Sequence, residues 1–159
     1  MPVEVGQEAP DFTLYNTEQK EISLKDLISK SNVVILFFPL AFTSVCTKEL
    51  CSTRDDINQY EELNATIIAI SIDSLFTLAK YREEQQLPFD LLSDFNKDIS
   101  RKYDSLYELF PKFGLKGVTK RSAFVIDKQG IIKYKEILAD PTKIPDFDKI
   151  KETLENCDK

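Results

Sequence analysis

Three cysteines and no histidine define the chemistry open to this chain of 159 residues. The thiols are Cys46, Cys51 and Cys157, and no imidazole is present to act as a general base or as a zinc ligand. Ser-His-Asp and Cys-His catalytic pairs are therefore excluded. An enzyme of this sequence has to work with cysteine, carboxylate, lysine, tyrosine or arginine side chains. Because the number of cysteines is odd, they cannot all pair within one chain.

Cys46 lies where a cysteine is most easily activated. The apolar run from Val33 to Phe38 predicts a buried strand that stops at Pro39, and a helix is expected to begin around Val45. In the first turn of such a helix, unpaired N–H groups and the helix dipole stabilise a thiolate. These surroundings can lower a cysteine pKa from about 8.5 to roughly 3.5–7.5. The alternative is a small buried hydrophobic residue, with Thr43 serving only as a helix cap.

Short β-branched runs predict the strands that position this segment. Strands are predicted at 33–38, 66–72, 122–126 and 131–137, with a weaker hairpin at 12–15 and 19–22. Helices are predicted at 46–63, 74–86, 97–103 and 145–157. This order predicts an α/β domain in which helices cross over between central strands and an antiparallel pair comes late. A thioredoxin-like fold, with a central mixed β-sheet flanked by helices, fits the order best, although other α/β folds are not excluded by it.

Composition narrows the function classes further. Residues 1–159 contain no repeat or linker, which predicts a single domain. The net charge of −6, without a block of lysine and arginine, argues against binding to nucleic acid. No run reaches the roughly 20 apolar residues of a membrane span, and the N-terminus lacks the features of a secretory signal. The expected location is cytoplasmic, where cysteines are more often thiols than structural disulfides.

Several motifs in the chain resemble those of the peroxiredoxins. Pro39, Thr43 and Cys46 form P-x-x-x-T-x-x-C after the apolar strand, as in the active-site motif of that family. The segment Gly6–Phe12 matches the opening G-x-x-A-P-D-F, and Arg121 at the head of RSAFVIDKQGII matches the active-site arginine. The resemblance runs from Gly6 to the C-terminal helix. It implies a thiol peroxidase of thioredoxin-like fold that needs no metal and no cofactor.

The resemblance also implies roles for individual residues. Cys46 attacks a peroxide oxygen and becomes a sulfenic acid, and Arg121, a permanent cation, holds it as a thiolate. The hydroxyl of Thr43 can accept a hydrogen bond from one peroxide oxygen and donate a hydrogen bond to the other site. Backbone N–H groups at Val45 and Cys46 stabilise the leaving oxygen in the manner of an oxyanion hole. Pro39 covers the pocket and excludes water.

Glu49 admits two interpretations. It matches a family position that helps to orient the arginine, here Arg121. It could equally be a solvated carboxylate in the first turn of a helix, where the helix dipole favours negative charge.

Cys51 raises a geometric problem as the thiol that resolves Cys46. Five residues on an α-helix correspond to a rise of about 7.5 Å, with side chains roughly 140° apart. A disulfide needs Cα atoms within about 7 Å and converging Cβ vectors. Either the first turns unwind during turnover, or Cys51 does not resolve Cys46.

The subfamily signals on this point are mixed. The spacing C-x-x-x-x-C resembles the bacterioferritin-comigratory (Q-type) peroxiredoxins, in which the second cysteine resolves the first. The loop Pro39–Thr43 looks more like that of the E-type, often one-cysteine, members. We therefore expect Cys51 to resolve Cys46. The alternative is a one-cysteine enzyme that an external thiol reduces, in which Cys51 is a buried structural cysteine. Cys157 is expected to be a bystander near the C-terminus.

The expected function is reduction of hydrogen peroxide and organic hydroperoxides in antioxidant defence and redox homeostasis. The implied partners are the peroxide and a thiol reductant such as thioredoxin, with no nucleic acid and no membrane. The chain is expected to be a monomer or a homodimer, and the apolar rim at 40–42 suits either an organic peroxide or a dimer contact. A peroxide sensor or relay protein would carry the same active-site residues and remains the alternative function. A thioredoxin-type disulfide reductase is disfavoured because C-x-x-C is absent.

Overall fold

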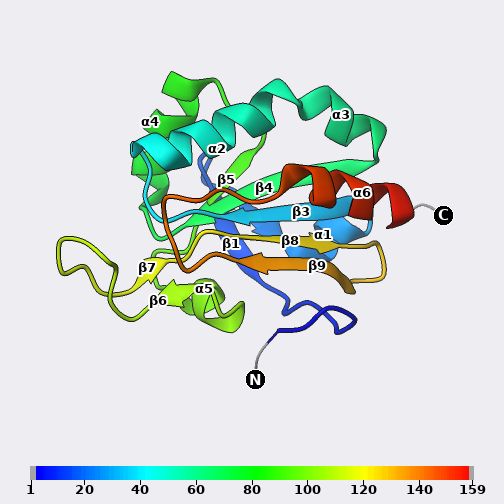
Figure 1. Cartoon of the computed structure of the whole chain (residues 1–159). Coiled ribbons are helices and arrows are strands. Elements are labelled where there is room, and N and C mark those ends of the chain that lie inside the picture. The colour runs from blue at the N-terminus through cyan, green and yellow to red at the C-terminus, as the bar shows by residue number, and fades with distance from the viewer. Residues whose placement is uncertain (1–2, 158–159) are drawn as a thin grey trace.

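The computed structural model describes residues 3–157, and a mixed β-sheet lies at its centre (Figure 1). Within these residues, seven strands form one sheet in the order β2-β1-β5-β4-β3-β8-β9. Their bounds are β1 (Thr13–Asn16), β2 (Glu21–Ser23), β3 (Asn32–Phe37), β4 (Ala65–Ser71), β5 (Asp90–Ser93), β8 (Ser122–Ile126) and β9 (Ile132–Ile137). Two short strands, β6 (Leu106–Tyr107) and β7 (Val118–Thr119), pair apart from this sheet.

Helices cover both faces of the sheet (Figure 1). One face packs against α2 (Ser44–Asp55), α3 (Ile57–Glu62), α4 (Leu75–Gln85) and α6 (Phe147–Cys157). The other face packs against α1 (Leu24–Ile28) and α5 (Asp98–Lys102). Within the described residues, none of these helices is both long and apolar enough to cross a membrane.

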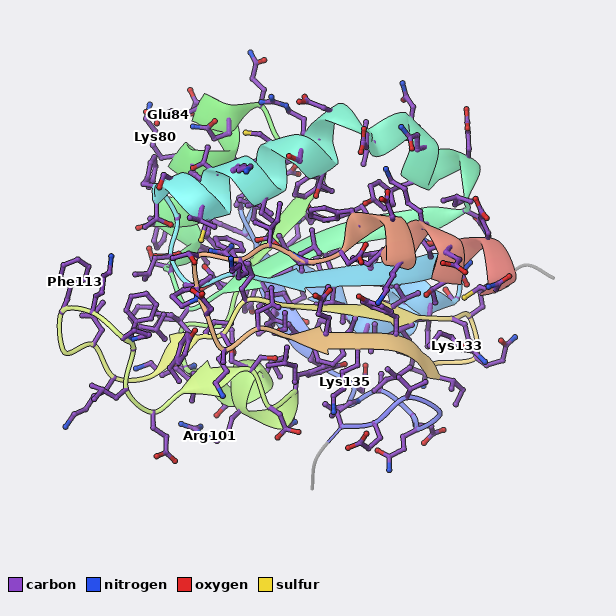
Figure 2. The ribbon with its side chains drawn as sticks, viewed as in Figure 1. Lys80, Glu84, Arg101, Phe113, Lys133 and Lys135 are labelled. Carbon is purple, nitrogen blue, oxygen red and sulfur yellow. The ribbon has the colours of Figure 1, made fainter. Side chains whose placement is uncertain are left out.

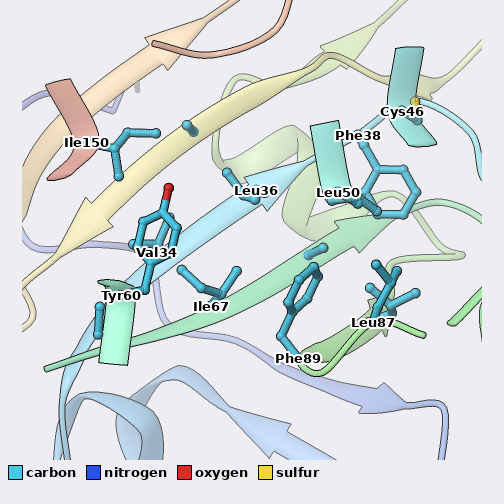
Figure 3. Packing of buried hydrophobic residues seen from close by; sticks show 14 of the residues in the cluster. Val34, Leu36, Phe38, Cys46, Leu50, Tyr60, Ile67, Leu87, Phe89 and Ile150 are labelled. Atoms are coloured by element: carbon cyan, nitrogen blue, oxygen red, sulfur yellow. The ribbon is translucent and has the colours of Figure 1, made fainter. Parts of the chain in front are cut away.

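The central strand β3 holds the two layers together. It pairs in parallel with β4 and antiparallel with β8. Because side chains alternate along a strand, Val34, Leu36 and Phe38 face the layer of α2, whereas Ile35 and Phe37 face the layer of α1 and α5. Figure 3 shows Phe38 beside Leu50 and Cys46, where the first of these layers reaches the start of α2. A strand buried on both faces requires the near-continuous apolar sequence that is seen here.

The predicted fold class is confirmed: the structure is an α/β fold with a central mixed sheet flanked by helices. The strands predicted at 33–38, 66–72, 122–126 and 131–137 correspond to β3, β4, β8 and β9. The hairpin predicted at 12–15 and 19–22 is present as β1 and β2. The short elements α1, β5, β6 and β7 were not predicted, because two to five residues are too few to display a period.

The helix predicted over 46–63 is instead two helices. The chain leaves helical geometry at Asp56, with φ −100° and ψ 11°, between α2 and α3. Asp56 accepts a hydrogen bond of 2.8 Å from Lys151 of α6, and Tyr60 on the far side of the break is buried in the core. The break therefore follows from tertiary contacts that the sequence period does not record.

Candidate active site

The loop between β3 and α2 places Cys46 at the carboxyl end of the central strand. Thr43 is the N-cap of α2, and Cys46 is the third residue of the helix, 1% exposed. Thr47 N–H donates to the Thr43 carbonyl over 3.0 Å, so the N–H groups that precede it in the first turn have no partner inside the helix. Pro39 is buried in the same loop.

A carboxylate that the sequence did not single out holds this loop in place. Asp73, in the connection between β4 and α4, accepts a hydrogen bond of 2.8 Å from the N–H of Ala41. The same oxygen accepts from the hydroxyl of Ser71 over 2.7 Å. Its only sequence signal is a position just after the strand that neighbours β3, where carboxyl ends of parallel strands meet. Asp73 thus fixes the backbone that leads into Cys46.

Arg121 brings a cation to the sulfur of Cys46. It is 1% exposed and directly precedes β8, whose Ser122 pairs with Phe37 at the end of β3. This register puts the arginine at the strand end that also starts the Cys46 loop. Its Nη2 donates to Cys46 Sγ over 3.2 Å and to the Pro141 carbonyl over 3.1 Å. The sulfur of Cys46 therefore lies in direct contact with a buried guanidinium.

Glu49 is the other partner of Arg121, and the interpretation as a solvated carboxylate is wrong. The side chain is 0% exposed, and its Oε1 accepts a hydrogen bond of 2.7 Å from Arg121 Nη1. Burial raises the pKa of Glu49 to about 7, although Arg121 opposes the shift. Burial lowers the pKa of Arg121, but Glu49 and Cys46 raise it more, and it ends above its ordinary value. One fixed cation therefore faces two acidic groups.

Thr43 lies three residues before Cys46, at the N-cap position of α2. Its exposed side-chain hydroxyl donates to the Leu40 carbonyl over 2.8 Å. Its hydrogen is engaged in this contact, and the expected exchange of hydrogen bonds with a bound molecule stays a prediction. The remaining lone pairs can accept a hydrogen bond from a molecule next to Cys46.

The other two cysteines, Cys51 and Cys157, occupy different surroundings. Cys51 lies on α2 with Cys46, is half-buried, and donates to Gln85 Oε1 of α4 over 3.4 Å. Because α2 is continuous over both positions, the two sulfurs cannot bond in this conformation. Cys157 ends α6, at the opposite end of the molecule from the start of α2 (Figure 1).

The burial of Glu49 has a consequence for stability. We expect the free energy of unfolding, relative to that of Glu49→Gln, to fall as the pH rises from about 4.5 to about 7. In this window the folded state keeps a proton on Glu49 that the unfolded chain has released, so raising the pH favours unfolding. The difference between the two proteins should change by roughly 1 kcal/mol per pH unit and be flat outside the window. Urea titrations from pH 4 to 8 measure it, and parallel profiles would show that folding does not shift the pKa of Glu49.

Comparisons with known proteins identify the family that the chain resembles. The chain matches the AhpC/TSA family over residues 5–135. It is 37% identical over 134 residues to a putative peroxiredoxin bcp of Coxiella burnetii, covering 83% of this chain and 87% of that protein. It is 35% identical over 147 residues to a chloroplastic 2-cysteine peroxiredoxin of Chattonella marina var. antiqua, covering 86% and 72%. Among solved structures, peroxidoxin BcpB from Mycobacterium tuberculosis superposes with a TM-score of 0.85 at 28% identity, covering 96% and 97%.

Proposed function

The chain belongs to the AhpC/TSA family of peroxiredoxins and is a thiol-dependent peroxidase, and we propose that Cys46 is the cysteine that peroxide oxidises. The observation that carries this proposal is the hydrogen bond of 3.2 Å from Arg121 Nη2 to Cys46 Sγ, at the buried start of α2. There a buried cation contacts a sulfur that lies in the first turn of a helix. This is the environment that activates a thiol without an imidazole.

The proposed reaction uses the groups that surround this sulfur. The Cys46 thiolate attacks one oxygen of hydrogen peroxide or an organic hydroperoxide, the O–O bond breaks, and Cys46 becomes a sulfenic acid. The leaving hydroxide or alkoxide takes a proton and departs as water or an alcohol. Arg121 and the free N–H groups of α2 stabilise the negative charge as it moves to the leaving oxygen. Thr43 accepts a hydrogen bond from the peroxide, and Pro39 keeps water away from the reacting atoms.

Cys51 completes the proposed cycle. Its thiolate attacks the sulfenic sulfur of Cys46, hydroxide leaves, and a Cys46–Cys51 disulfide forms. Since both cysteines lie on α2, the first turns of the helix have to unwind for this step. A reductant such as thioredoxin then supplies the two electrons that return both residues to thiols. An external thiol that reacts directly with the sulfenic acid is the alternative route.

A Cys51→Ser variant tests this cycle. We expect its first oxidation by peroxide to keep the parent rate, while steady turnover with thioredoxin and its reductase falls at least about tenfold, because no internal thiol remains to form the disulfide. Peptide mapping under non-reducing conditions should find a Cys46–Cys51 peptide in the oxidised parent. The matched control is Cys157→Ser, which should turn over like the parent. Unimpaired turnover of Cys51→Ser would contradict internal resolution and favour the external thiol.

The remaining partners are part of the same proposal. The thiols of Cys46 and Cys51 suit a reducing compartment, which supports a cytoplasmic location where thioredoxin is the reductant. The enzyme acts as a monomer or as a homodimer. For a homodimer, the structure offers exposed apolar side chains, among them Phe42, Phe76 and Phe113. Figure 2 shows Phe113 projecting from the loop between β6 and β7.

A further inference from the structure

Tyr81 of α4 contacts the segment that carries Cys46 on both sides of the cysteine. Its hydroxyl lies 2.9 Å from Thr47 Oγ1, one residue after Cys46 in the first turn of α2. Its ring packs edge-on against Phe42 in the preceding loop, with ring centroids 5.0 Å apart. Tyr81 itself is 0% exposed, and Thr47 is half-buried. The side chain of Tyr81 therefore connects α4 to the start of α2.

A separate set of contacts connects the later part of α2 to Gln85 of α4. Arg54 Nη1 donates to the Gln85 carbonyl over 2.6 Å, and Cys51 Sγ donates to Gln85 Oε1 over 3.4 Å. Residues 81 and 85 are one turn apart on α4, so the same face of α4 meets α2 at two points. Lys80 and Glu84 each precede one of these two residues, project into solvent and form an ion pair of 3.8 Å (Figure 2).

These two attachments have different consequences for the resolving step. Unwinding the first turn of α2 has to break the contact between Tyr81 and Thr47, because Thr47 belongs to that turn. It leaves the contacts of Gln85 in place, and these keep Cys51 where it is. We infer that the Tyr81 hydroxyl is a positioning group that sets how readily Cys46 leaves its buried place to meet Cys51. This inference rests on the proposed resolution of Cys46 by Cys51.

The rate of that step decides between two fates of oxidised Cys46. Attack by Cys51 gives the disulfide and releases water. Attack by the sulfenate on a second peroxide molecule instead breaks another O–O bond, leaving a sulfinic acid on Cys46 and releasing water or an alcohol. While the hydrogen bond of Tyr81 delays unwinding, the second peroxide has more time to react. Burial raises the pKa of Tyr81 to about 12, so its hydroxyl remains neutral in this contact at physiological pH.

The test compares Tyr81→Phe and Thr47→Val, which remove the hydrogen bond from either side and keep most of the packing. The enzyme is cycled with dithiothreitol at increasing hydrogen peroxide, and mass spectrometry measures sulfinic acid on Cys46. We expect each variant to need roughly threefold to tenfold more peroxide for half conversion, the factor that one net hydrogen bond provides. The first oxidation should keep its rate, and the double variant should add little to either single one. Tyr60→Phe, at a buried tyrosine of α3, is the control and should match the parent.

Two outcomes would overturn the inference, and they are distinguishable. If Tyr81→Phe and Thr47→Val convert to sulfinic acid at the parent's peroxide concentration while the Cys46–Cys51 disulfide forms, the hydroxyl does not control unwinding. If peptide mapping finds no Cys46–Cys51 disulfide in the parent, the proposed resolution itself fails, and the inference fails with it.

Discussion

Cys46→Ser is expected to abolish peroxide reduction, with a loss of at least about 10³-fold. The substitution replaces one buried atom, so the loop, α2 and the contact between Arg121 and Glu49 should be kept. A serine hydroxyl stays protonated at neutral pH even beside a cation, and it therefore supplies no anionic nucleophile. Removal of hydrogen peroxide in the presence of dithiothreitol measures the effect directly.

The other two cysteines provide the control variants for this prediction. Cys157→Ser makes the same atomic change at the far end of the molecule and should leave the rate unaltered. Cys51→Ser should keep the first oxidation and lose only efficient recycling. If Cys46→Ser still consumed peroxide within tenfold of the parent, the nucleophile would have to be another cysteine. The cation at Cys46 would then have no role in the reaction.

How far the sequence predicts this site depends on whether a residue's partners are local. The apolar run of β3 and the start of the next helix are local patterns, and they suffice to place Cys46 in a first turn. Arg121 is found in the sequence only through the resemblance to a family. The register of β8 against β3 brings it to Cys46, and no local pattern records that register.

Glu49 shows the same limit in another form. Three residues after Cys46 on a helix, it has to lie on the same side as the cysteine. Whether that side faces water or protein depends on where β8 and the Pro141 segment pack, so the sequence leaves both interpretations open. Asp73 and Tyr81 carry no local signal for the same reason, since each acts on the Cys46 segment from a different element.

Charge balance at the site explains why the arginine has to be fixed. One guanidinium bridges two acidic groups, the carboxyl of Glu49 and the thiol of Cys46, in surroundings closed to water. Burial keeps Glu49 partly protonated near neutral pH, so the single positive charge remains available to the sulfur. Both groups therefore depend on the position of the same side chain.

Arg121→Lys should for this reason lower the second-order rate of Cys46 oxidation by at least about 10²-fold, although the formal charge is kept. A guanidinium donates through Nη1 to Glu49 while Nη2 reaches both Cys46 and the Pro141 carbonyl. A lysine has one nitrogen for these three acceptors, and burial disfavours its charged form. Stopped-flow measurement of the first oxidation as a function of pH gives the rate. Lys120→Ala, which removes the neighbouring cation, should change it no more than about twofold.

The double variant Arg121→Lys with Glu49→Gln separates two causes of this loss. If the lysine fails because it pairs with Glu49 and abandons the sulfur, removing the carboxylate should recover part of the rate and move its pH dependence. If it fails because a single ammonium cannot hold the geometry of the guanidinium, the double variant should be as slow as Arg121→Lys alone. We expect the double variant to be as slow as Arg121→Lys alone, because an ammonium lacks the planar fork of the guanidinium and the Pro141 carbonyl still competes for it. A parent-like rate in Arg121→Lys itself would show that charge alone activates Cys46, and the fork would then be a structural feature without a catalytic consequence.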